Sequence, residues 1–323
     1  MTISDFETTL NDWGHQRVPF LFVIDFEMKK PVALRLDQVD NQVILFDING
    51  VSNCTGNFQR QKADTTIVKK PISFEEYRDK FTTVYRRLEL GDSYLTNLTI
   101  KTEVELKASL RDLFFESRAR YKLFFKDEFL VFSPEIFVQV SNDRIYSYPM
   151  KGTIDKAVPD AANTILHDTK EIAEHVTIVD LIRNDISQVA TDVHVSRFRY
   201  LEEIHTNQKD LFQVSSEIVG TLNNAYSKIG TVLVTLLPAG SVSGAPKPKT
   251  IDIIRLAEGE ERGYYTGVMG IFDGHKFDSG VIIRFIEKTN GRYFYRSGGG
   301  VTTQSDSHAE FQEVLDKIYV PVN

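Results

Sequence analysis

Cysteine, positive charge and long apolar runs are all scarce in this 323-residue chain, and each scarcity excludes a class of protein. Cys54 is the only cysteine, so an intramolecular disulfide is impossible and a thiolate metal cage is excluded. The chain has 38 Lys and Arg against 45 Asp and Glu, and this net charge of -7 argues against a nucleic-acid partner. No segment approaches the roughly 18 uninterrupted apolar residues of a membrane span, and the first residues lack the pattern of an export signal. We therefore expect a cytoplasmic protein that acts on small molecules, with no nucleic-acid or membrane partner.

Nucleotide-binding motifs are missing as well. The glycine-rich segment from Gly240 to Pro246 matches neither a Walker loop nor a Rossmann fingerprint. It is predicted to lie between an apolar strand and a helix, where its backbone amides could hold an anion at the helix N-terminus. Ser243 and Gly244 are therefore candidate ligand-binding residues.

The pattern of apolar residues predicts an α+β protein. Residues 1–70 alternate as strands do, most clearly at 20–24 and 42–46, and are predicted to form a short β-rich N-terminal extension that packs on the core. Residues 71–323 are predicted to form the main domain. Helices and antiparallel strands interleave there without a βαβ rhythm, which favours α+β. We expect helices from a capping box at Ser73 to Gly91 and at 110–121, 169–186, 245–256 and 307–319, and strands at 123–125, 129–132, 136–140, 268–272, 280–287 and 292–297.

Lys151 follows a predicted strand and enters a loop, the place where a scaffold usually displays reactive groups. A lysine between Pro149 and Gly152 is more often a solvated turn residue than a catalyst. The functional interpretation therefore requires a substrate and a metal beside it.

Two predicted helices carry paired carboxylates. Glu171 and Glu174 are three residues apart and share one helical face, and Glu310 and Glu313 repeat the pattern, with Lys317 four residues further along. If the two helices face each other, four carboxylates converge on a hard-cation site suited to Mg²⁺. The alternative is that each pair lies on a solvated helix face.

Two further features point to an anionic ligand. Arg284 lies within the apolar run 281–286, where an arginine is costly unless it meets an anion or an acidic partner. The run Gly298-Gly299-Gly300 lets a backbone approach a ligand closely, although a flexible bend explains it equally well.

Together these segments resemble the chorismate-utilising enzyme family over residues 73 to 320. The motifs that carry the resemblance occur in the family's order: Gly91 to Thr99, Ser133-Pro134-Glu135, Pro149 to Thr153, Glu174-His175, Val179 to Asp185, Gly240 to Pro246, Arg262 to Gly267, Arg284, Gly298 to Gly300 and Glu310 to Glu313.

The resemblance implies a large layered assembly of antiparallel sheets flanked by helices, in which residues 71–323 form the chorismate-binding catalytic domain. It implies that the four glutamates hold Mg²⁺, which binds the ring carboxylate of chorismate. Arg284 and Tyr265 would hold the enolpyruvyl carboxylate, helped by Lys317 and by the backbone amides of Gly298 to Gly300.

Three positions distinguish branches of the family. Anthranilate synthases usually carry alanine where this chain has Lys151, whereas aminodeoxychorismate synthases carry a lysine that is thought to attack the ring covalently. Isochorismate and salicylate synthases usually place a water-activating lysine at the position of Leu95. Gln213 stands where relatives commonly have a histidine, and a glutamine has no useful pKa for proton transfer.

The resemblance therefore implies Mg²⁺-dependent amination of chorismate at C4 to 4-amino-4-deoxychorismate, a step towards para-aminobenzoate and folate, with Glu135 shuttling protons. Glu135 could instead be a structural carboxylate.

The setting of Cys54 does not suit a glutaminase nucleophile, so ammonia is expected from a separate glutamine amidotransferase subunit. An anthranilate synthase large subunit and a non-catalytic chorismate-binding protein remain as alternatives, the latter because Ile154-Asp155-Lys156 departs from the family pattern.

Overall fold

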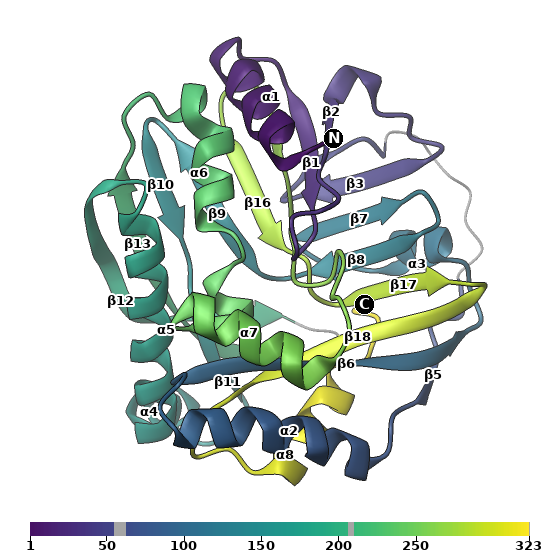
Figure 1. The fold of residues 1–323 in the computed structure, drawn as a ribbon, viewed down its shortest axis with the longest axis vertical. Helices are drawn as coiled ribbons and strands as arrows, with labels where there is room; N and C mark the ends of the chain where they lie inside the picture. The colour runs from purple at the N-terminus through teal and green to yellow at the C-terminus, as the bar shows by residue number, and fades with distance from the viewer. Residues whose placement is uncertain (55–62, 206–209, 323) are drawn as a thin grey trace.

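The computed structural model describes residues 1–54, 63–205 and 210–322, and these form two large antiparallel sheets with helices packed on their outer faces (Figure 1). The α+β class and the layered, antiparallel arrangement predicted from the sequence are confirmed. None of the helices within the described ranges is long and apolar enough to cross a membrane.

The first sheet has nine strands among the described residues. The long β13 pairs with three neighbours, β10, β11 and β12. Along the sheet the strands are β11 (Met150–Asp155), β13 (Asp210–Thr221), β10 (Arg144–Ser147), β9 (Ile136–Ser141), β16 (Phe277–Val281), β15 (Val268–Phe272), β1 (Phe20–Ile24) and β2 (Val32–Arg35), with β12 (Thr191–His205) beside β13.

The second sheet also has nine described strands. Its centre is the long pairing of β6 with β18, which carries the three successive glycines into register with Thr99, Leu98 and Asn97. Along this sheet the strands are β14 (Gly244–Ala245), β6 (Leu95–Leu106), β18 (Arg292–Val301), β17 (Phe285–Thr289), β8 (Phe129–Ser133), β7 (Tyr121–Phe125), β3 (Ile44–Ile48) and β4 (Val51–Ser52), with β5 (Ile67–Lys70) beside β6.

One core cluster joins the two sheets. Alternate residues of β1, such as Leu21 and Val23, point to this cluster, where they meet Phe46 of β3 and Val131 of β8. The intervening residues Phe20, Phe22 and Ile24 point to the other face. Strand β1 is therefore buried on both faces, which explains its uninterrupted apolar sequence.

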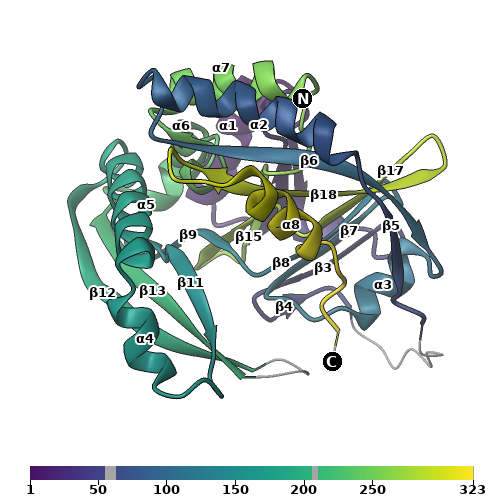
Figure 2. The same cartoon turned by 90° about the horizontal axis from the view of Figure 1, so that it is seen from below.

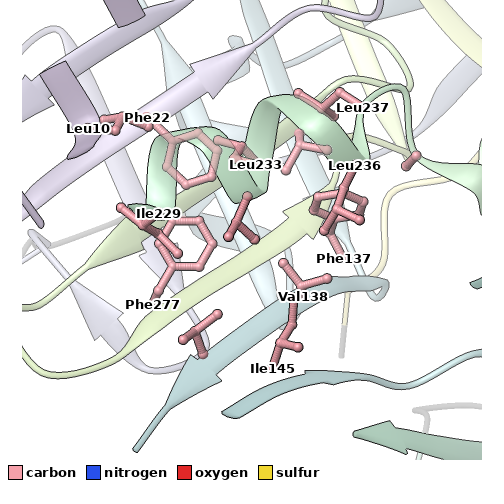
Figure 3. Packing of buried hydrophobic residues seen from close by; sticks show 14 of the residues in the cluster. Leu10, Phe22, Phe137, Val138, Ile145, Ile229, Leu233, Leu236, Leu237 and Phe277 are labelled. Atoms are coloured by element: carbon pink, nitrogen blue, oxygen red, sulfur yellow. The ribbon is translucent and has the colours of Figure 1, made fainter. Parts of the chain in front are cut away.

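Helices α1 (Ile3–His15) and α6 (Ile229–Leu236) cover the outer face of the first sheet. In Figure 3, Leu233 and Leu236 of α6 lie over Val138 of β9 and Phe277 of β16. The two helices pack closely where Gly230 of α6 meets α1, since a Cβ on Gly230 would stand 2.2 Å from the carbonyl oxygen of Glu7.

The remaining helices are distributed over both sheets. Helices α4 (Ala161–His167) and α5 (Thr169–Ser187) cover the part of the first sheet formed by β11, β12 and β13 (Figure 2). Helices α2 (Phe74–Glu89), α7 (Lys247–Glu258) and α8 (Ser307–Asp316) cover the second sheet near β6 and β18, and α3 (Leu110–Glu116) packs on β7 and β8. Short 3₁₀ turns occupy Leu36–Gln38, Ala225–Lys228 and Gly240–Val242.

The N-terminal 70 residues contribute to both sheets. β1 pairs with β15 of the first sheet, and β3 and β5 pair with β7 and β6 of the second. Helix α1 was not predicted, although its capping box between Thr2 and Asp5 is visible in the sequence. The division of the chain at residue 70 stays a prediction.

Several predicted elements differ from the structure. The predicted strand 280–287 is two strands, β16 and β17, because Arg284 adopts a left-handed conformation with φ of 53° where the chain passes from one sheet to the other. The predicted helix 110–121 ends at Glu116. The segment Gly240 to Pro246 follows helix α6 rather than a strand, and Gly298 to Gly300 lie inside β18 rather than in a bend.

Candidate active site

A cavity of about 170 Å³ lies between α5, the β9–β11 region and the ends of β6 and β18. One face of α5 lines it, from Glu174 through Ile178 and Ile182 to Asp185, as the helical repeat requires. The cavity brings together five residues predicted from the sequence, and Leu95 lies in the same wall. The predicted residues are Glu135, Lys151, Glu174, Gly244 and Gly300.

Lys151 lies inside β11, so its predicted position in a loop after a strand is wrong. The ladder between β11 and β13 shifts register between Met150 and Thr153, and Gly152 has a φ of 84°. Such an irregularity re-aims side chains on an edge strand, and here Lys151 lines the cavity. Gln213 lies on β13 opposite Thr153, beside this irregularity.

The ammonium group of Lys151 pairs with Glu174 of α5, with 2.7 Å between Nζ and Oε2. Burial lowers the pKa of Lys151, but the hydrogen bond to Glu174 and the charges of Glu174, Glu171 and Glu313 outweigh it, so the pKa is raised. In this arrangement Lys151 is an ammonium ion. Attack as a neutral amine requires Lys151 to lose a proton as well as its pairing with Glu174.

The second carboxylate pair lies on α8 above the glycines of β18. A Cβ on Gly299 would stand 3.2 Å from Oε2 of Glu310 and 3.8 Å from Oε1 of Glu313, so the glycine keeps this space open. Lys317 pairs with Glu313 at 2.7 Å and donates a hydrogen bond to the carbonyl of Gly298 at 2.8 Å. Burial raises the pKa of Glu310, a hydrogen bond from Ser305 opposes that rise, and the charge of Glu313 adds to it.

Lys151 lies near carboxylates of both helices, because the charges of Glu171 and Glu174 on α5 and of Glu313 on α8 raise its pKa, and its own charge acts on Glu310 of α8. In the described residues, no group of three or more His, Cys, Asp or Glu is close enough to hold a metal ion. The donors nevertheless suit a hard cation, since all are carboxylate oxygens and Oε2 of Glu171 is buried without a hydrogen-bond partner in the described chain. Metal binding would require Glu174 and Glu313 to release their lysines.

Glu135 lies in the turn between β8 and β9, not on a strand, and accepts a hydrogen bond of 2.5 Å from the hydroxyl of Ser241. Burial raises the pKa of Glu135, and the hydrogen bond from Ser241 and the charges of Arg284 and Lys317 oppose that rise. Glu135 therefore lies in the cavity wall and near Arg284 and Lys317, the two cations predicted to bind substrate.

Arg284 and Tyr265, both predicted to bind substrate, are not among the residues that line the cavity. The guanidinium of Arg284 lies 5.2 Å from the ring centre of Tyr319, and its Nε is buried without a hydrogen-bond partner in the described chain. Burial raises the pKa of Tyr265 to about 12, against the opposing charges of Arg262 and Arg284. Ser243 points elsewhere, because its hydroxyl donates to the carbonyl of Ala239 at 2.9 Å and is fully buried.

The sequence reasoning missed several cavity residues. Asn97 lines the cavity, and its Oδ1 is buried without a partner in the described chain. Ser241 orients Glu135, and Asp185 lines the far end, where it pairs with Lys247 at 2.9 Å. Each of these residues except Lys247 lies within one of the family motifs. The motifs therefore include these residues, but a motif alone does not indicate which of its side chains line the cavity.

The profile of the chorismate binding enzyme family matches residues 29–323, a longer part of the chain than the quoted motifs span. An uncharacterized PabA-like protein of Haemophilus influenzae is 46% identical over 322 residues, which cover 99% of this chain and 98% of that protein. Aminodeoxychorismate synthase component 1 of Escherichia coli is 30% identical over 261 residues, 76% of this chain and 56% of that protein. The crystal structure of anthranilate synthase component I from Streptococcus pneumoniae is similar with a TM-score of 0.68 and 26% identity, covering 81% of this chain and 60% of that one. This chain belongs to the family of chorismate binding enzymes.

Proposed function

We propose that this protein aminates chorismate at C4 to form 4-amino-4-deoxychorismate, with Mg²⁺ as its cofactor and ammonia from a glutamine amidotransferase partner. The observation that carries the proposal is that Lys151 and Leu95 line the same cavity. Lys151 supplies a nucleophile, and Leu95 cannot activate water. The similarity to an aminodeoxychorismate synthase component supports this choice, although the chain spans 56% of that relative.

In the proposed reaction, the Lys151 ammonium first loses a proton to solvent, and the neutral amine then forms a bond to the ring as the bond to the 4-hydroxyl breaks. Glu135 donates the proton with which the hydroxyl departs as water. Ammonia then displaces the lysine and so forms the new C–N bond, while Glu135 accepts a proton. The charge of Arg284 opposes the rise in the pKa of Glu135, so Arg284 lies near enough to hold a substrate carboxylate close to this residue.

Glu171, Glu174, Glu310 and Glu313 would hold Mg²⁺, which would neutralise the ring carboxylate of chorismate when bound. The same Glu174 carboxylate pairs with Lys151, so binding of a cation and pairing with the lysine compete for one group. The buried, unpartnered oxygen of Glu171 favours a cation in this position.

The test is to incubate the purified protein with chorismate, ammonium and Mg²⁺ and to identify the product by mass spectrometry. We expect 4-amino-4-deoxychorismate. Anthranilate, detected by its fluorescence, would instead assign the protein to the reaction named for its Streptococcus pneumoniae relative. No consumption of chorismate would overturn the proposal in favour of a non-catalytic binding protein.

The partner is tested by replacing ammonium with glutamine. We expect no product from glutamine and the protein alone, and product once a glutamine amidotransferase subunit is added. Product from glutamine without any added subunit would overturn the partner hypothesis.

A further inference from the structure

Arg262 is buried and does not line the cavity. Its side chain is 1% exposed, and that of Glu258, its partner in the last turn of α7, is 2% exposed. Nε of Arg262 donates to Oε2 of Glu258 at 2.9 Å and Nη2 donates to Oε1 at 2.6 Å. This two-pronged pairing fixes the plane and direction of the guanidinium.

The other donors of the guanidinium reach three separate segments of the chain. Nη2 donates to the carbonyl of Asn97 at 2.7 Å, and Nη1 donates to the carbonyl of Val242 at 2.8 Å and to Oγ1 of Thr266 at 3.3 Å. A guanidinium has five N–H groups, so every donor of Arg262 has an acceptor. Glu258 also contacts β6, because its Oε1 accepts a hydrogen bond from the backbone amide of Thr99 at 2.9 Å.

Each of the three segments carries a residue that lines the cavity or is predicted to bind substrate. The side chain of Asn97 lines the cavity on β6. Val242 lies between Ser241, which holds Glu135, and Gly244.

The third segment is the one that carries Tyr265. Thr266 has a φ of 60°, a conformation that costs a β-branched residue energy. Its hydroxyl donates to the carbonyl of Tyr265 at 2.6 Å. Arg262 therefore holds a strained residue directly after the tyrosine predicted to bind a substrate carboxylate.

We propose that Arg262, oriented by Glu258, is a positioning residue that sets the relative placement of Asn97, the Ser241–Gly244 segment and Tyr265 for binding chorismate. Replacing a buried ion pair with apolar residues is often neutral for stability, so stability alone is a weak explanation for such a pair. One rigid planar group that bonds to three segments instead explains their fixed arrangement. This inference rests on chorismate binding in the cavity, as in the proposed function.

The test is R262K, which keeps the charge but loses the planar fork and two of the five donors. We expect kcat/KM for chorismate to fall about ten- to a hundredfold, mainly through KM, because small displacements of binding groups are costly. The dissociation constant for chorismate should rise in parallel, and the KM for ammonium should not change.

The matched control is R296K. Arg296 is 5% exposed and pairs with Glu287 at 2.9 Å, but its hydrogen-bond partners Glu287, Glu260 and Glu261 do not line the cavity. We expect R296K to lower the melting temperature about as much as R262K while the KM for chorismate stays at the parent value. An equal rise in KM in both variants would overturn the inference, because the effect would then follow from stability alone.

Thr266 provides a milder second pair of variants should R262K fail to fold. T266V removes one acceptor of Arg262 and should raise the KM for chorismate, whereas T266S keeps the hydroxyl and should behave as the parent. Unchanged chorismate affinity in folded R262K or in T266V would overturn the inference. A parent protein that neither binds nor consumes chorismate would overturn the proposed function itself, and this inference with it.

Discussion

Lys151 and Glu174 both line the cavity and form an ion pair, with Nζ and Oε2 separated by 2.7 Å. The pair joins β11, at the edge of the first sheet, to α5, which packs on that sheet. The proposed function assigns the lysine to the reaction and the glutamate to the cation. The two proposed roles are therefore coupled through one carboxylate.

Removal of the Lys151 amine should stop amination. We expect K151A to form 4-amino-4-deoxychorismate about 10²-fold more slowly or worse, the size of loss expected for a group that acts on the reacting atoms. The measurement is product formation from chorismate, ammonium and Mg²⁺ followed by mass spectrometry. The control is K156A, because Lys156 forms only a half-exposed pair with Glu203 just after the same strand. Undiminished product from K151A would defeat the covalent route.

Neutralising one carboxylate of α8 should weaken cation binding. We expect E310Q to bind Mg²⁺ about tenfold more weakly or worse, since affinity for a hard cation depends on the number of charged ligands. Titration calorimetry with and without chorismate measures this directly, and a chelator should abolish chorismate consumption by the parent. E75Q is the control, because the Glu75 side chain is 80% exposed on α2. Equal Mg²⁺ affinity in E310Q and the parent would remove Glu310 from the proposed site.

Glu135 should make stability depend on pH. Its pKa is raised in the folded state, chiefly by burial, so its charged form is disfavoured there. Its contribution to stability is therefore full below its ordinary pKa and is lost as pH rises through the folded-state value. Glutamine does not ionise, so E135Q should have a higher free energy of unfolding than the parent at pH 8. The difference between the two proteins should shrink towards pH 5. Urea unfolding at both pH values measures it.

The same variant tests the proton-transfer role of Glu135. E135Q keeps an acceptor for Ser241 but cannot carry a proton, so amination should fall about 10²-fold while the protein stays folded. Full activity in E135Q would leave Glu135 as a structural carboxylate. A stability difference that is the same at pH 5 and pH 8 would contradict the expected raised pKa.

Two neighbouring glycines should respond differently to the same change. In G298A the new Cβ would lie 2.6 Å from the carbonyl oxygen of Leu98, so the pairing of β18 with β6 must shift, at a cost of about 1–3 kcal/mol of unfolding free energy. In G299A the Cβ would meet only the flexible ends of Glu310, Glu313 and Lys317. We therefore expect G299A to keep its stability and to lose affinity for Mg²⁺ and chorismate. Urea unfolding and calorimetry separate the two effects, and a G299A variant that binds both ligands as the parent does would contradict the expected site.

Much of the fold could be predicted from local patterns. The capping serine and apolar stripe of α2 predicted a helix that the structure shows at Phe74–Glu89, and the aromatic runs predicted β7, β8 and β9. Helix α1 and the break between β16 and β17 were missed. The break depends on Arg284 in a left-handed conformation, and an apolar run of sequence gives no sign of it.

Part of the candidate site could also be predicted from local patterns in the sequence. The spacing of Glu171 and Glu174 on one helix, and of Glu310 and Glu313 on another, is a property of the helical repeat and can be read locally. The pairing of Lys151 with Glu174 depends on the irregular ladder of β11 and on how α5 packs against it. Arg262 was quoted within a motif but received no role, because its acceptors lie up to 165 residues away in the chain.

The sequence by itself determined the kinds of element, the family resemblance and the residue types available for chemistry, because these follow from local periodicity and composition. Only the tertiary structure decided which of those residues meet. In the folded chain Lys151 lines the cavity, and Glu310 lies over Gly299. The guanidinium of Arg262 has five hydrogen-bond acceptors there. The physical reason is that such contacts depend on strand register and on the packing of helices against sheets, and both are set by interactions between residues distant in the chain.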